Sequence, residues 1–484
     1  MVAMRWAMRL LGLVNTFILA RLLAPDDFGL VAMAMLVVGL VEVLGQTGQM
    51  LALIRHPNPT RAHYDSVWTL TLMVAGALTL LLWAVAPLAP LYFGEPRATE
   101  LIQVLALRTL VGGFENVGVV TFRRDLQFGQ EFRFQVLQRV ASVLATIACA
   151  VWLGDYRALV AGILVGRILG VALSYAAHPY RPRLCLARIP EMLSFSGWML
   201  VVHLASYCNE RADEMTVGAV AGPAAMGEYN VAADLATAPT QEIILPVVRA
   251  LFPVFARIGG DPAAARAAFL DVFAASCLIC MAVGGGMALV ARDFVAVALG
   301  SQWTGAVVLV QILALGGAFA GCVAGVPAVL SAMGHSRLTA QLSVTRAVVM
   351  VLGVVPAALL GGLQAIAVTR VLVMLAFLPG ALVAVRRVLP VSTADLVQRL
   401  WRPLAAMLVM ALAVAEVHGW APASPWLRLP IDVAVGAGAY TATVLALWRA
   451  AGQPPGPEAA LCQWVRDALL ARFGQSRSHS GGTT

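Results

Sequence analysis

The sequence predicts an all-α membrane protein of about 14 transmembrane helices, with two six-helix lobes around a central cavity and two further helices. Hydrophobic residues make up 60% of the 484 residues and charged residues only 12%, about half the charged share of an ordinary soluble protein. Apolar windows long enough to span a bilayer follow one another along the chain. In addition, a turn near the N-terminus recurs in the second half, which indicates an internal duplication.

Six helices are expected in the first lobe because short polar turns separate six apolar windows. These windows cover residues 10–23, 28–54, 67–93, 101–120, 134–153 and 159–177. The sixth window contains Gly162, Gly166 and Gly170, a spacing typical of close helix packing. We therefore expect a helix seam there rather than a chemical site.

A second set of windows follows the same plan and adds two helices at the end. It covers residues 194–220, 226–255, 268–290, 305–330, 338–360, 365–385, 404–418 and 429–447. The turn Ala24-Pro25-Asp26-Asp27-Phe28-Gly29 recurs as Gly222-Pro223-Ala224-Ala225-Met226-Gly227. Proline suits the first turn of a helix, and glycine lets two helices approach closely.

We accordingly divide the chain into four parts. Residues 1–190 form the N-terminal lobe, 191–390 the C-terminal lobe, and 391–450 the two additional helices. Residues 451–484 are expected to form a cytoplasmic amphipathic helix and a disordered Ser/Gly-rich tail.

The placement of arginine predicts the orientation. The sequence contains no lysine, so all 33 basic residues are arginines and the net charge of +8 depends on them. With the N-terminus inside, most loop arginines fall on the cytoplasmic side, as the positive-inside rule requires. The exceptions are Arg21, Arg97, Arg157, Arg292 and Arg428. Both termini are therefore expected in the cytoplasm of a bacterial cell, with the helices in its inner membrane.

Charged residues inside the apolar windows are the candidate site. An ionised group at the bilayer centre costs roughly 3 kcal/mol, so such groups must face protein, water or one another. The arginines singled out for a substrate site are Arg108, Arg139, Arg167, Arg211, Arg346 and Arg370. Because a guanidinium matches phosphate oxygens in pairs, an excess of arginine in a cavity suits a pyrophosphate. Ion pairing with nearby carboxylates explains each arginine equally well, and both interpretations stay open.

Four acidic residues are candidates for coupling to a proton or sodium gradient: Glu42, Glu210, Asp213 and Asp234. Glu42 is expected to share a polar stripe with Gln46 and Gln49 on one helix, although an interhelical hydrogen bond explains that stripe as well. No metal or cofactor is expected, because the seven histidines form no ligand spacing. Cys277 and Cys280 lie in an apolar window and are expected to be small buried hydrophobic residues.

An enzyme is the rival class, namely a polytopic glycosyltransferase or polymerase acting on lipid-linked sugars. Its support is the pair Asp26 and Asp27 in the first outer turn. First-turn acids also stabilise a helix N-terminus, and the repeated turn has Ala224 and Ala225 instead. The prediction is therefore a protein that is not an enzyme.

Five motifs belong together: residues 19–34, which include the first turn, and residues 193–196, 209–213, 227–232 and 249–256. In combination they resemble bacterial polysaccharide transporters, the lipopolysaccharide and exopolysaccharide flippases of the multidrug/oligosaccharidyl-lipid/polysaccharide exporter superfamily. The resemblance covers roughly residues 5–390 and is specific in the combination of motifs.

The resemblance implies outward flipping of an undecaprenyl-diphosphate-linked oligosaccharide by alternating access. A polysaccharide polymerase and export machinery are the partners that it implies, and no nucleic acid is expected. An ion-coupled drug exporter remains the alternative among transporters, beside the glycosyltransferase among enzymes.

Overall fold

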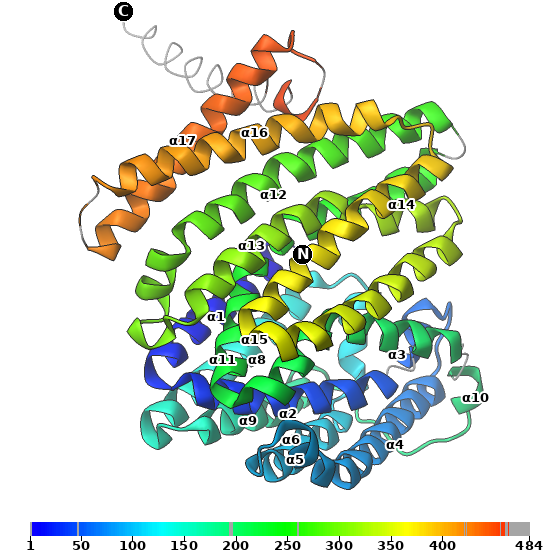
Figure 1. The fold of residues 1–484 in the computed structure, drawn as a ribbon. Coiled ribbons are helices and arrows are strands. Elements are labelled where there is room, and N and C mark those ends of the chain that lie inside the picture. Colours follow the sequence, from blue (N-terminus) through cyan, green and yellow to red (C-terminus); the bar gives the residue numbers. More distant parts are fainter. Residues whose placement is uncertain are drawn as a thin grey trace, which may run out of the picture. The chain divides into compact units, whose positions relative to one another are not determined.

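The computed structural model describes residues 2–45, 48–192, 197–258, 261–420, 422, 424–454, 456–459 and 463. These residues form helices and no strand, which confirms the all-α prediction (Figure 1). The expected cytoplasmic amphipathic helix and tail fall mostly outside the described residues.

The first half of the chain contains ten α-helices. They are α1 (Val2–Leu22), α2 (Pro25–Leu44), α3 (Gln49–Arg55), α4 (Arg61–Val85), α5 (Ala89–Phe93), α6 (Arg97–Gly113), α7 (Val120–Arg124), α8 (Phe128–Leu153), α9 (Tyr156–Ala177) and α10 (Ile189–Met192). Short 3₁₀ turns η1 (Ala86–Leu88) and η2 (Val117–Val119) lie between them.

The second half contains longer helices. They are α11 (Gly197–Ile258), α12 (Pro262–Ala298), α13 (Ala306–Val323), α14 (Val326–Ala332), α15 (Ser336–Val388), α16 (Thr393–His418) and α17 (Pro425–Ala450), with η3 (Ser301–Trp303) after α12. Glycines with non-helical backbone angles interrupt two of them, Gly222 in α11 and Gly362 in α15. A positive φ is accessible to glycine without the steric cost that a side chain adds, and both breaks lie where the sequence predicted a turn.

Within the described residues, nine helices are long and apolar enough to cross a membrane, or ten if α6 and α7, which meet at 69°, form one span. The chain is therefore a multi-pass membrane protein. The count of fourteen stays a prediction. α15 counts as one span despite its break at Gly362.

The prediction of one continuous helix over residues 28–54 was wrong, and the windows 101–120 and 305–330 are interrupted as well. Residues 28–54 do not form a continuous helix, because α2 ends at Leu44 and α3 begins only after Gly48, which has a left-handed backbone. Gln49 therefore does not share a helix with Glu42, and it donates instead to the Thr71 hydroxyl at 2.8 Å. Gln46 lies outside the described residues.

The chain forms two compact units. Unit 1 consists of Met1–Ala233, Val295–Leu309 and Ser343–Val373, and unit 2 consists of Asp234–Phe294, Val310–Leu342 and Met374–Thr484. The lobe boundaries that we predict at residues 190 and 390 concern the sequence repeat and stay a prediction.

In unit 1, the two copies of the repeated turn pack directly against each other. A Cβ on Gly29 would lie 1.7 Å from the carbonyl oxygen of Pro223, and a Cβ on Gly227 would lie 1.9 Å from that of Pro25. Each glycine thus makes room for the proline of the other copy. The close approach expected of these glycines is confirmed. The glycine seam of α9 is confirmed too, since Gly162 and Gly166 face Thr146 and Ser142 of α8.

An extended segment, residues 178–188, runs along α4 in unit 1. The backbone N–H groups of Arg183 and Cys185 donate to Asp65 Oδ1 and Thr69 Oγ1, each at 2.9 Å. Asp65 and Thr69 are buried, so these bonds satisfy polar groups on both sides. Hydrogen bonds from its backbone to side chains of α4 therefore hold the segment, together with the packing of Tyr180 against Tyr64.

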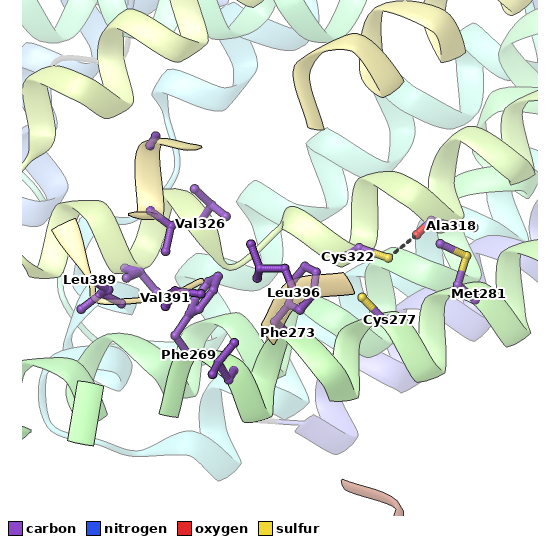
Figure 2. Packing of buried hydrophobic residues seen from close by; sticks show 14 of the residues in the cluster. Phe269, Phe273, Cys277, Met281, Ala318, Cys322, Val326, Leu389, Val391 and Leu396 are labelled. Carbon is purple, nitrogen blue, oxygen red and sulfur yellow. Dashed lines mark hydrogen bonds between the residues drawn. The ribbon is translucent and has the colours of Figure 1, made fainter. Parts of the chain in front are cut away.

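Unit 2 has its own apolar core, to which α12, α13, α16 and α17 contribute buried residues. Figure 2 shows those of α12, α13 and α16. Phe269, Phe273 and Cys277 of α12 are buried in it, together with Cys322 of α13 and Leu396 of α16. Cys277 and Cys280 are fully buried, which confirms that they serve as small apolar residues.

Candidate functional site

The acidic pair Asp213 and Glu214 lies on α11 ahead of the break at Gly222 and is almost fully buried. Asp213 Oδ2 accepts a hydrogen bond from the Tyr229 hydroxyl at 2.5 Å and pairs with the guanidinium of Arg370 on α15. Tyr229 reaches Asp213 because the chain turns at Gly222. A buried carboxylate requires partners of this kind to offset its lost hydration.

Glu214 has a separate set of partners. Arg211 Nη1 lies 2.6 Å from Glu214 Oε2, a pair at i,i+3 on one helix face. Asn230 Nδ2 lies 3.5 Å from the same oxygen. Asp213 and Glu214 are therefore each paired with an arginine, Asp213 with one on α15 and Glu214 with one on α11 itself.

Two more predicted arginines are paired within the first half of the chain. Arg108 Nη1 lies 3.1 Å from Glu42 Oε1, which also accepts from the Thr109 hydroxyl at 2.9 Å. Arg167 Nη1 lies 3.0 Å from Glu115 Oε2. Glu42 is thus held by α6, as an interhelical hydrogen bond would require.

The remaining two arginines differ. Within the described residues, neither Arg139 nor Arg346 forms an ion pair. Arg139 lies beside α1, where a Cβ on Gly12 would be 3.0 Å from its Nη2. The charged groups of Arg370 and Glu210 lie near Arg346, but no carboxylate in the described part of the chain forms an ion pair with it.

The side chains of the other four arginines stay partly exposed although each forms an ion pair. The side chains of Arg108, Arg167, Arg211 and Arg370 keep 30%, 31%, 42% and 29% of their surface exposed. Their carboxylate partners on α11 are exposed by less than a tenth. In these two pairs the arginine side chain is therefore more accessible than the acid that holds it, whereas Glu42 and Glu115 are about as exposed as their arginines.

The remaining coupling candidates lie on α11. Glu210 is exposed on its first half, and Asp234 is exposed on its second half and belongs to unit 2. The roles proposed for Glu42, Glu210, Asp213 and Asp234 stay predictions.

The pair that supported an enzyme has structural partners. Asp27 Oδ2 accepts from the backbone N–H of Ala24 at 3.0 Å, and its Oδ1 accepts from that of Tyr156 at 2.9 Å. Asp26 Oδ2 lies 3.3 Å from Arg97 Nη2. These contacts close the start of α2, as first-turn acids do.

A comparison with known protein families shows which family the chain belongs to. Residues 18–308, more than half of the chain, match the family described as polysaccharide biosynthesis protein. The chain belongs to this family. The resemblance to polysaccharide transporters that the motifs predicted is thereby confirmed.

Named relatives in the polysaccharide biosynthesis family extend the match. The succinoglycan biosynthesis transport protein ExoT of Rhizobium meliloti is 27% identical over 90% of this chain and 89% of its own. The lipopolysaccharide biosynthesis protein WzxC of Escherichia coli is 23% identical, and the alignment spans 63% of either chain. The teichuronic acid biosynthesis protein TuaB of Bacillus subtilis is 23% identical over 57% of this chain and 58% of its own.

Solved structures show which fold this family member adopts. The lipid II flippase MurJ in an inward closed conformation superposes with a TM-score of 0.75 at 13% identity, covering 93% of this chain and 99% of MurJ. An inward-facing multidrug resistance MATE transporter gives 0.60 at 14% identity, covering 79% and 95%. The chain therefore shares the fold of these two membrane proteins. The family, the transport protein among the relatives and this fold agree with the predicted transporter rather than with an enzyme.

Sequence reasoning missed Tyr229, Thr109 and Asn230 as partners of the buried charges. Tyr229 and Asn230 stand in the motif Gly227-Glu228-Tyr229-Asn230, which was noted for its resemblance alone. A helical turn at Gly222 brings residues on its two sides face to face, so the turn itself was the available signal.

Proposed function

We propose that this protein flips lipid-linked oligosaccharide repeat units from the cytoplasmic to the outer leaflet of the bacterial inner membrane by alternating access. Membership of a polysaccharide biosynthesis family supports a glycan substrate, and ExoT, a transport protein, is similar over nine tenths of the chain. The fold of a lipid II flippase supports movement of a sugar head group while its lipid tail stays in the bilayer.

The observation on which this proposal rests is the state of Arg346 and Arg139. Each lies within a long helix, and neither has a carboxylate partner in the described part of the chain. A guanidinium without a counterion at membrane depth is costly unless water or an anion reaches it. A diphosphate presents the paired oxygens that the guanidinium fork binds best.

The paired arginines contribute in a second way. Arg108 contacts Glu42 through Nη1 alone, whereas a guanidinium has five N–H donors. An incoming phosphate can therefore share Arg108 with Glu42. Protonation of Glu42 would free Arg108 entirely, which is how we propose that a proton gradient acts on this pair; a sodium gradient is the alternative coupling.

The same proposal places both termini in the cytoplasm, where most loop arginines are expected. It also assigns a polysaccharide polymerase and export machinery as the proteins that use the flipped product.

Deletion of the gene tests the function in cells. We expect complete lipid-linked repeat units to accumulate on the cytoplasmic leaflet, because synthesis continues while export stops. Incomplete repeat units would indicate a glycosyltransferase instead. Unchanged glycans together with raised drug sensitivity would indicate a drug exporter.

The site is tested by substitution of Arg346 in reconstituted liposomes with fluorescent lipid-linked substrate. Arg346→Ala should abolish flipping and Arg346→Lys should restore part of it, since the charge remains while the planar fork is lost. Arg337→Ala is the matched control, an exposed arginine at the start of the same helix. Full activity of Arg346→Ala would remove this residue from the site.

A further inference from the structure

Three residues from three helices of unit 2 bring an imidazole and two carboxylates together. Asp293 comes from the end of α12, His418 from the end of α16 and Asp432 from the second turn of α17. Their ligand atoms all lie within 4.8 Å of one another, and His418 Nδ1 lies 2.9 Å from Asp432 Oδ2. We call these three residues the Asp–His–Asp cluster.

Both carboxylates are buried, so each needs hydrogen-bond or charged partners to offset its lost hydration. Asp293 is 2% exposed and accepts two hydrogen bonds from Arg428, one from Nε at 2.7 Å and one from Nη2 at 2.5 Å. Asp432 is 1% exposed, and its Oδ1 has no hydrogen-bond partner in the described part of the chain. A buried carboxylate oxygen left unsatisfied is costly and calls for a bound group.

The charges of the cluster also leave room for a further positive group beside the two carboxylates. Two carboxylates beside a single guanidinium leave one negative charge in a buried place when His418 is neutral. A proton on the imidazole would balance that charge, and so would a divalent metal ion that carries a hydroxide in its open position. Only a metal ion can contact Asp432, His418 and Asp293 at once, because a proton bridges just two atoms.

The ligand set also fits a metal. One imidazole nitrogen and two carboxylate oxygens are a three-ligand set for Zn²⁺, with a fourth position for water. Arg428 does not block Asp293, since each carboxylate oxygen has a second lone pair, and such an outer partner orients the ligand. The His418 side chain is 37% exposed, so an ion can enter from solution.

We propose that the Asp–His–Asp cluster binds a divalent transition metal and thereby fastens the end of α12 to the α16–α17 hairpin. The metal replaces the proton between His418 Nδ1 and Asp432 Oδ2. The proposal is independent of the flippase function. No linear spacing reveals the cluster, because Asp293 on α12 is distant in sequence from His418 and Asp432 on the consecutive helices α16 and α17; no metal was expected for this reason.

The test uses the full-length protein, purified in detergent and stripped of metal with a chelator. Titration with zinc chloride, followed by elemental analysis after gel filtration, should give one tightly bound zinc ion per chain. His418→Gln and Asp432→Asn should each abolish that ion and the rise in unfolding temperature that it produces. Asp271→Asn and His335→Gln are the matched controls, exposed residues of the same types, and should bind zinc as the wild type does.

X-ray absorption on the zinc-loaded wild type gives a measurement that needs no variant. It should show nitrogen and oxygen ligands at about 2.0–2.2 Å and no sulfur. A wild type that binds no zinc, variants that bind it unchanged, or a sulfur ligand from the cysteines would each overturn the proposal.

Discussion

The buried ion pair between Asp213 and Arg370 gives the sharpest quantitative prediction for unit 1. Asp213 is fully buried, whereas Arg370 keeps 29% of its side-chain surface exposed. Removal of the arginine therefore leaves an uncompensated charge on a fully buried acid, while removal of the acid leaves a cation on a side chain that is only partly buried. The two single substitutions should consequently differ in cost.

The magnitudes follow from that asymmetry. Arg370→Leu should lower the free energy of unfolding by about 3 kcal/mol, the lower end for a broken buried pair, since the Tyr229 hydroxyl still donates to Asp213. Asp213→Asn should cost about 1.5 kcal/mol, the loss of one hydrogen bond to a charged group. The double variant should cost no more than Asp213→Asn alone, because a neutral amide in place of the carboxylate no longer needs the arginine.

The assay is a double-mutant cycle on the purified protein, unfolded by a titration with denaturing detergent. The coupling energy between the two sites should reach about 3 kcal/mol. The exposed pair Asp26 and Arg97 is the matched control, and its coupling should stay below about 1 kcal/mol. A coupling energy below about 0.5 kcal/mol for Asp213 and Arg370 would refute the claim that the buried Asp213 carboxylate depends on Arg370 for its stability. The same double variant also separates stability from transport, since it should fold yet flip substrate poorly if Arg370 contacts the diphosphate.

Two further predictions concern packing in unit 1. Gly227→Ala should destabilise the protein by about 1–3 kcal/mol in thermal unfolding, because its Cβ would meet the Pro25 carbonyl at 1.9 Å; Gly76→Ala, with nothing within 4 Å of the new Cβ, should be neutral or stabilising, and equal effects would contradict the packing. Trp303→Phe should cost about 1 kcal/mol, since the indole donates to the Ala20 carbonyl at 2.8 Å and a phenyl ring loses that bond, while Gln302 Nε2 still donates to the same oxygen; an unchanged unfolding temperature would show that the indole bond adds nothing beside the bond from Gln302.

Much of the fold could be predicted from local sequence because hydropathy and glycine act locally. The breaks at Gly222 and Gly362 lie at the expected turns, and the Gly29 contact agrees with the repeated motif. The failure at residues 28–54 has the same origin. There the apolar residues on either side outweigh the short polar stretch from Gly45 to Gln49, so the average over the window hid a change in backbone direction.

The partners of the candidate arginines were only partly predictable. Arg211 and Glu214 are three residues apart on one helix, so their pairing follows from helical geometry. Arg370 and Asp213 lie on different helices, and their contact depends on how α15 packs against α11. Tertiary packing is also what leaves Arg346 without a carboxylate in the described part of the chain, and no local pattern contains that information.

The extended segment along α4 has a consequence for how the chain tolerates insertions. Arg183 and Cys185 donate from alternate residues, as in a strand, so successive N–H groups point in opposite directions. One added residue ahead of Arg183 would therefore rotate the whole row of donors away from Asp65 and Thr69, whereas two added residues would preserve the phase. The connection that leads to α11 is thus sensitive to the parity of its length, more than to the chemistry of its side chains.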